Sequence, residues 1–185
     1  MSSPRRANRG PAAAAENRAA LLAAAKAIFS ERGLDVPLSL IARTAGVGQG
    51  SLYRHFPNRE AIILAVFEEN IGQLEALVAD ADSTLDELLS EIVDQMTTAS
   101  AFFEPLQLVD SADPRLVGVI ERMFALLSDK LDDESRRGSI RADATAQEIF
   151  LAIGMLGAFL NKTPERDRVA VARDGWALLL RALRS

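Results

Sequence analysis

The 185-residue sequence has no cysteine, a single histidine and no apolar run near the roughly 20 residues that cross a membrane as a helix. The absence of cysteine excludes disulfides, thiolate metal sites and cysteine nucleophiles. The lone His55 cannot hold a metal ion by itself, and no nucleophile lies near it in the sequence. We therefore expect a protein without metal, cofactor or enzymatic activity. Because the N-terminal segment lacks the apolar core of a signal peptide, we expect a cytoplasmic location and no membrane partner.

Acidic residues exceed basic ones, and the net charge of −5 alone argues against a nucleic-acid ligand. The charges are unevenly distributed, however. Residues 1–60 hold nine basic and four acidic side chains, a net charge of +5, so the remaining 125 residues carry −10. A basic N-terminal part on an acidic body indicates that the N-terminal part meets a polyanion.

The rest of the sequence indicates an all-α fold of about nine helices, because apolar residues recur at helical spacing and no segment alternates with period two. Residues 1–15 are rich in Arg, Pro, Gly and Ala and are interpreted as a flexible basic tail. Turn signals separate the expected helices. These are Glu16–Arg32, Leu38–Ala45, Gln49–Phe56, a helix capped by Asn58, Thr84–Ala101, a short piece at Pro105–Val109, Pro114–Arg137, Ala144–Leu160 and Glu165–Leu183.

The segment Leu38–Phe56 has the layout of a helix-turn-helix, in which two short helices flank a turn and the second enters the major groove. At 100° per residue, Leu52 and Phe56 define the buried side of the second helix. Gly50 and Arg54 then point the opposite way, toward base edges, while Tyr53 and His55 flank the buried side, toward phosphates. Each residue also has a purely structural interpretation: a solvated Arg54, a Gly50 required by turn geometry, or a core His55.

The segment GLDVPLSLIARTAGVGQGSLYRHFPNREAIILAVF, and above all AGVGQGSLYRHFPNRE, resembles the DNA-binding domain of TetR-family regulators. The resemblance is close over Glu16–Phe67 and looser over the rest of the chain. It implies a homodimer that binds a palindromic operator and is released by a small molecule. By matched position, it implies DNA contacts from Gln49, Gly50, Ser51, Tyr53, Arg54, His55 and Arg59, with Ser39 and Arg43 as further phosphate contacts.

We accordingly expect a tail over residues 1–15, a DNA-binding domain over 16–60 and a ligand-binding and dimerisation domain over 61–185. Arg5, Arg6 and Arg9 form either an arm that reaches DNA or only a solubilising tail.

Two C-terminal segments carry more apolar residues than a surface helix needs, which favours a four-helix interface with a second copy over burial within a monomer. The residues assigned to this interface are Ile149, Ile153, Leu156, Gly157, Leu160, Trp176 and Leu179. Large apolar residues of the fourth to eighth helices are candidates for lining a ligand pocket, although core packing is the default explanation for each of them. They are Met96, Phe102, Phe103, Met123, Phe124 and Leu127.

The sequence thus predicts a ligand-responsive regulator, most simply a repressor, whose partners are double-stranded operator DNA, a second copy and a small-molecule effector. Two alternatives remain open: a ligand-independent architectural DNA-binding protein, and a small-molecule carrier. The first predicts a fully packed body, and the second predicts ligand binding without DNA binding.

Overall fold

The computed structural model describes residues 10–80, 82–98 and 113–184, and these form eight α-helices and no strand. The expected piece at 105–109 lies outside the described residues, as do Arg5, Arg6, Arg9, Phe102 and Phe103. The helices are α1 (Pro11–Arg32), α2 (Leu38–Thr44), α3 (Gln49–His55), α4 (Arg59–Val78), α5 (Leu85–Thr98), α7 (Pro114–Asp132), α8 (Ala146–Leu160) and α9 (Glu165–Leu183). The all-α prediction is confirmed, and α9 has the expected bounds.

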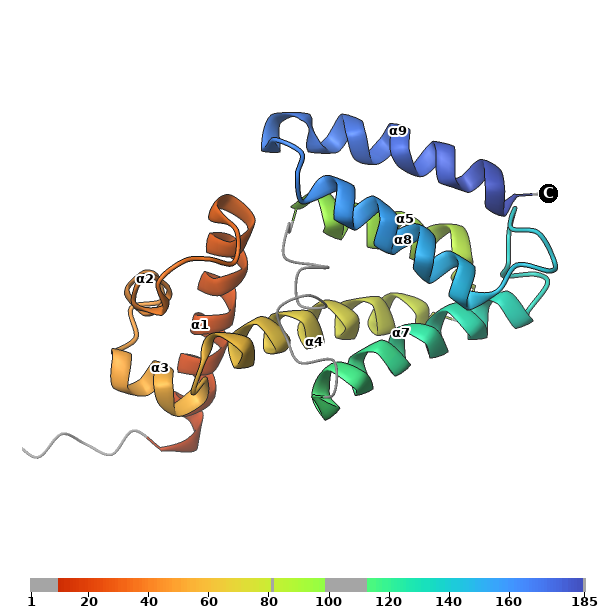
Figure 1. Cartoon of the computed structure of the whole chain (residues 1–185). Helices are drawn as coiled ribbons and strands as arrows, with labels where there is room; N and C mark the ends of the chain where they lie inside the picture. Colours follow the sequence, from red (N-terminus) through yellow and green to blue (C-terminus); the bar gives the residue numbers. More distant parts are fainter. Residues whose placement is uncertain (1–9, 81, 99–112, 185) are drawn as a thin grey trace, which may run out of the picture.

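Figure 1 shows α1, α2 and α3 gathered at one end and α4 running from them into the rest of the molecule. There α5 and α7 pack against α4, and α8 and α9 complete the other half of the molecule. Two groups of buried residues correspond to this arrangement. The head cluster is the apolar core of α1–α3 and the first turns of α4, with Phe29, Ile41 and Leu52 among its members. The body cluster is the core of the remaining helices, with Leu88 and Ile149 among its members.

Helix α4 belongs to both clusters. Ala61, Ile62, Ile63, Ala65 and Val66 lie in the head cluster, whereas Leu64 and the residues from Phe67 onward lie in the body cluster. The helix starts where the sequence predicts, because the Asn58 side chain accepts a hydrogen bond of 2.8 Å from the Ala61 amide. The two clusters are therefore joined through a single continuous helix rather than through a loop.

Other helix ends differ from the sequence prediction for local chemical reasons. Helix α1 begins at Pro11, inside the expected flexible tail, because proline suits the first helical turn and four alanines follow it. Helix α7 stops at Asp132, five residues early. There the Asp133 carboxylate accepts hydrogen bonds from the Ser135 amide at 2.9 Å and from Arg136 Nε at 2.7 Å. These bonds stabilise a turn instead of another helical turn.

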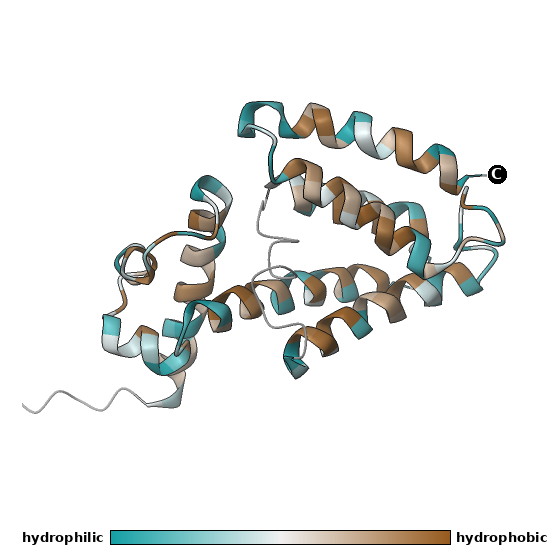
Figure 2. Cartoon of the chain, in the orientation of Figure 1, coloured by the Kyte–Doolittle hydropathy of each residue, from teal (hydrophilic) through white to brown (hydrophobic). Residues whose placement is uncertain are grey.

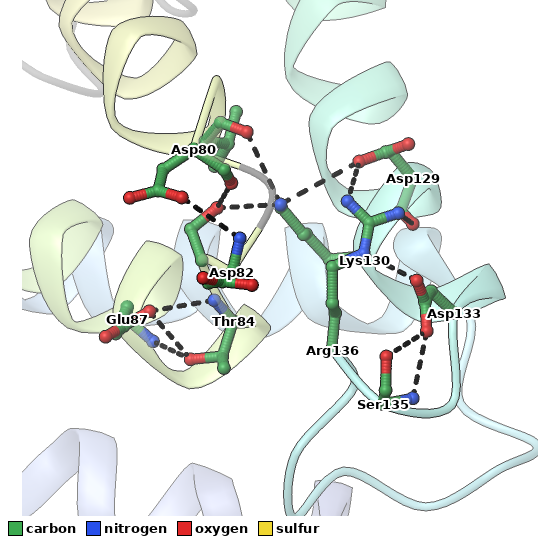
Figure 3. A network of polar contacts seen from close by, with 11 residues as sticks. Asp80, Asp82, Thr84, Glu87, Asp129, Lys130, Asp133, Ser135 and Arg136 are labelled. Carbon is green, nitrogen blue, oxygen red and sulfur yellow. Dashed lines mark hydrogen bonds and ion pairs between the residues drawn. The ribbon is translucent and has the colours of Figure 1, made fainter.

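A polar network joins the end of α4 to the end of α7 (Figure 3). Lys130 is completely buried, and its ammonium donates to Ser83 Oγ at 2.8 Å and to the Val78 carbonyl at 3.4 Å. The Ser83 hydroxyl in turn donates to the Asp80 carbonyl at 2.7 Å. The cation therefore lies where the last carbonyls of α4 lack helical partners, a position that suits a positive charge.

Candidate DNA-binding surface

The turn between α2 and α3 sets how α3 is presented. Gly46 adopts a left-handed conformation with φ 66°, which glycine tolerates best. The Val47 amide then donates to the Ala42 carbonyl at 2.9 Å, so the chain reverses tightly before α3 begins. Leu52 and Phe56 are 1% and 2% exposed in the head cluster, as the helical wheel predicts. The opposite side of α3 consequently faces away from the protein.

The outward side of α3 carries the side chains that the sequence analysis assigned to DNA. Gln49, Gly50, Tyr53 and Arg54 are exposed, whereas Ser51 and His55 are half-buried. Their side chains form no hydrogen bond or ion pair with the described residues. The His55 ring does contact the ring of Phe56, with centres 6.4 Å apart. These polar groups are therefore available to an external partner.

Gly50 lies in an unusual position for a glycine. Its φ is not positive, so the turn interpretation offered from the sequence does not apply. A Cβ built on it would meet nothing within 4 Å, so no neighbour in the chain requires its small size. A glycine that weakens a short exposed helix without an internal reason suits the close approach of a partner's backbone.

Ser39 and Arg43 of α2 are also exposed and lie beside the start of α3. Arg59, unlike the other side chains expected at DNA, has polar partners within the described chain. Its guanidinium donates to the Leu34 carbonyl and lies 3.5 Å from Asp35 in the loop after α1. Arg59 thus ties α4 to that loop, and a phosphate would have to share or replace these contacts.

One side chain that holds α3 in place was not expected from the sequence. The guanidinium carbon of Arg18 lies 5.3 Å from the centre of the Phe56 ring, a cation–π contact between α1 and the end of α3. Arginine at helical spacing gives no sequence signal for an aromatic partner 38 positions later, so this contact is visible only in the fold.

The interface residues predicted from the sequence lie mostly on the inner side of their helices. Six of the seven are buried within the chain's own body, because both helices pack their strongest apolar stripe against the body cluster, and Leu179 is half-buried against it. The six are Ile149, Ile153, Leu156, Gly157, Leu160 and Trp176.

A different apolar surface points outward from α8 and α9, and we call it the outward apolar face. It consists of Leu151, Met155, Ala158 and Phe159 of α8 and Leu178 of α9. Leu151, Phe159 and Leu178 are each more than 60% exposed. The spacing of the α8 residues, i, i+4, i+7 and i+8, places them on one side of the helix. Figure 2 shows apolar residues along both helices.

Three of the residues predicted for a ligand pocket pack in the core. Met96, Met123 and Leu127 are at most 2% exposed in the body cluster, and the Phe124 ring stacks on Phe150 with centres 4.9 Å apart. These four residues do not line the hollow of about 530 Å³ that opens between α5 and α9. That hollow has an apolar floor that includes Leu89, Val93 and Trp176, with Arg173 and Arg184 at its rim.

The described residues hold no group of histidine, cysteine, aspartate and glutamate side chains suited to a metal ion. Within the same part of the chain, no helix is long and apolar enough to cross a bilayer.

An exposed second helix after a tight turn, on a three-helix head, defines a DNA-binding protein of the helix-turn-helix class. Comparison with known proteins identifies the family. Residues 21–66 match the model of bacterial regulatory proteins of the tetR family. The chain is 31% identical over 180 residues to the HTH-type transcriptional repressor BepR of Brucella suis, with 83% of each chain covered.

Solved structures agree with this assignment. The TetR transcriptional regulator SCO0520 of Streptomyces coelicolor is 31% identical with a TM-score of 0.64, covering 90% of this chain and 98% of that one. A TetR transcription regulatory protein of Mycobacterium vanbaalenii is 30% identical with a TM-score of 0.59, covering 94% and 98%. The chain belongs to the TetR family of transcriptional regulators.

Proposed function

We propose that this protein is a repressor that binds a palindromic operator as a homodimer and leaves it when a small molecule binds the body. The observation that carries the proposal is the outward side of α3, where Gln49, Tyr53 and Arg54 are exposed without internal partners. DNA-binding side chains need this freedom, because base edges and phosphates must replace water as their hydrogen-bond partners.

The outward apolar face supports the homodimer. Three large side chains more than 60% exposed on two neighbouring helices exceed what an isolated surface residue would explain. A second copy related by a two-fold axis would present the same residues and cover them, which gives an isologous four-helix contact. We therefore propose the outward apolar face as the dimer interface, in place of the residues predicted from the sequence.

Two heads related by a two-fold axis imply a palindromic operator. One seven-residue helix contacts few base pairs, so useful specificity requires two half-sites. In helix-turn-helix dimers the half-sites lie about 34–36 Å apart, or a multiple of that distance. An effector that changes the spacing of the heads would then weaken binding.

We divide the roles as the sequence suggests, with residues 16–60 for DNA and 61–185 for the effector and the second copy. The head cluster also takes in the first turns of α4, so the division runs through one packed unit. We further propose that the protein is not an enzyme and acts in the cytoplasm, where the chromosomal DNA of bacteria lies.

Selection of bound duplexes from a random pool by the purified full-length protein tests this function, followed by titration of the best duplex at several salt concentrations. We expect a palindrome, two chains per duplex, and an affinity that falls steeply with salt because several phosphates are neutralised. Affinity that barely changes with salt would contradict the proposal. Ligand binding without any DNA binding would favour the carrier, and DNA binding that no metabolite weakens would favour the architectural protein.

A further inference from the structure

A hollow beside the outward side of α3 brings together the last turn of α1, helix α2 and the start of α3. Its polar side chains come one or two from each helix: Arg32 from α1, Ser39 and Arg43 from α2, and Gln49 from α3. The remaining lining is small or apolar, including Pro37, Leu40, Ala42, Val47 and Gly48. Three helices therefore contribute donors to one concave surface.

The charge of this hollow is of one sign. Arg32 and Arg43 are exposed, and no acidic residue lines the hollow. Neither guanidinium forms a hydrogen bond or an ion pair with the rest of the described chain. By contrast, two exposed arginines of the body are paired: Arg115 with Asp113 at 2.7 Å, and Arg173 with Asp174 at 2.9 Å. Two unpaired cations in one hollow attract an anion.

Arg32 also has a structural interpretation. A cation in the last turn of a helix interacts favourably with the helix dipole. The end of α1 already has a cap, however, because the Gly33 amide donates to the Phe29 carbonyl at 3.0 Å. The dipole role predicts an effect on stability alone, which separates it experimentally from a role in binding.

We propose that this hollow binds a phosphate of the operator backbone and that Arg32 is a DNA contact, although neither α2 nor α3 contains it. The inference rests on the proposed function and adds a contact from α1 to those expected from α2 and α3. Arginine suits the role because its guanidinium can donate two parallel hydrogen bonds to phosphate oxygens. The contact fixes how the head sits on the duplex and does not read sequence.

The test compares Arg32→Ala, Arg32→Lys and the wild type on the selected operator between about 50 and 200 mM salt, where each phosphate contact adds roughly −0.9 to the slope of log affinity against log salt. Because two copies bind each duplex, Arg32→Ala removes two contacts, which changes the slope by about 1.8 and makes the affinity drop over this range about 12-fold smaller. We expect this change for Arg32→Ala and a slope near the wild type for Arg32→Lys. Arg137→Ala is the control, because Arg137 lies beyond the end of α7 and contacts only the Ala142 carbonyl, at 3.4 Å.

The outcomes separate this inference from the proposed function. Wild-type protein that binds an operator together with an unchanged slope for Arg32→Ala overturns the phosphate contact and leaves the proposed function standing. A lower melting temperature for Arg32→Ala with an unchanged slope also overturns the phosphate contact and assigns Arg32 to the helix dipole. Relaxed sequence preference in Arg32→Ala would place the side chain on a base instead. A wild type that binds no duplex overturns both.

Discussion

Glu75 of α4 and Arg122 of α7 form a two-pronged ion pair, with Nε 2.6 Å from Oε1 and Nη2 2.5 Å from Oε2. The hydrogen bonds from Arg122 lower the pKa of the Glu75 carboxyl below its ordinary value of 4.5. Both side chains are about two-fifths exposed, so the pair contributes at most about 1 kcal/mol at neutral pH. It is nevertheless the described ion pair that links these two helices.

This pair predicts a dependence of stability on pH. Its contribution is fully present above the unfolded pKa of Glu75 and is lost as the pH falls below about 4.5 and through the lowered folded value. Urea unfolding of the wild type and Glu75→Gln at pH 7 and in steps below pH 4.5 measures the difference. We expect the two proteins to differ at pH 7 and to converge in acid. A difference that stays constant with pH would show that the charge of Glu75 is irrelevant.

Substitution of Gly50 by alanine should separate folding from DNA binding. The added methyl group meets nothing in the chain, and alanine is favoured over glycine in a helix by about 1 kcal/mol. We therefore expect an unchanged or higher melting temperature together with weaker binding to the selected operator. Gly72→Ala is the matched control, because Gly72 is also helical and open but lies on α4. Full operator affinity in Gly50→Ala would show that DNA does not approach this backbone.

Arg54 should contribute to sequence preference and Tyr53 to general affinity. Arg54→Ala should cost about 1–3 kcal/mol for each half-site of the best operator and relax the preference at one base pair of each half-site. Tyr53→Phe removes only the hydroxyl, so it should weaken binding to all duplexes alike. Titrations against the operator and single-base variants distinguish the two effects. Because both side chains are exposed, a marked loss of thermal stability in either variant would assign them structural roles.

The outward apolar face should hold the two copies together. Phe159→Asp places a charge in the middle of that face, so we expect a monomer by light scattering and greatly weakened operator binding. Val169→Asp is a close control. Val169 is 69% exposed against 64% for Phe159, but it lines the hollow between α5 and α9 instead of the outward apolar face. A dimeric Phe159→Asp protein would exclude the proposed interface.

The buried ammonium of Lys130 should stabilise the fold. Lys130→Met keeps the apolar stem and removes the donor to Ser83 and to the Val78 carbonyl, so the Ser83 hydroxyl keeps only its hydrogen bond to the Asp80 carbonyl. We expect a loss of about 1–3 kcal/mol in urea unfolding. Lys162→Met, at an exposed lysine, should change stability by less than about 0.5 kcal/mol. A more stable Lys130→Met protein would show that desolvation of the ammonium exceeds the gain from its contacts.

The sequence predicted α3 more accurately than the body, for a physical reason. Leu52 and Phe56 are the only large apolar residues near the inner side of a short polar helix, so the wheel has one solution. Helix α8 is apolar nearly all round. Its periodicity therefore cannot tell whether the side that carries Ile149 or the side that carries Leu151 is buried in the chain's own core. The apolar α8 side chains predicted for the interface are therefore those that pack in the body cluster. Only packing against α7 and α9 decides which side is left outside.

Contacts between distant residues were also beyond the sequence. The resemblance implies a DNA contact from Arg59, and no pattern in the sequence indicates that its guanidinium would also donate to the loop carbonyl of Leu34. Similarly, a single lysine among the polar residues of α7 gave no sign that it would be buried at the end of α4. Such positions depend on how helices cross, which local patterns do not encode.

The membership of α4 in both cores has a mechanical consequence. Its 20 residues extend about 30 Å, and a rigid rod of that length turning by about 10° moves its tip by roughly 5 Å. Repacking beside Leu74 would thus be magnified at Ile62, and α3 would be carried along because its Leu52 belongs to the same head cluster. A small molecule that never touches DNA can in this way move α3 out of register with its half-site.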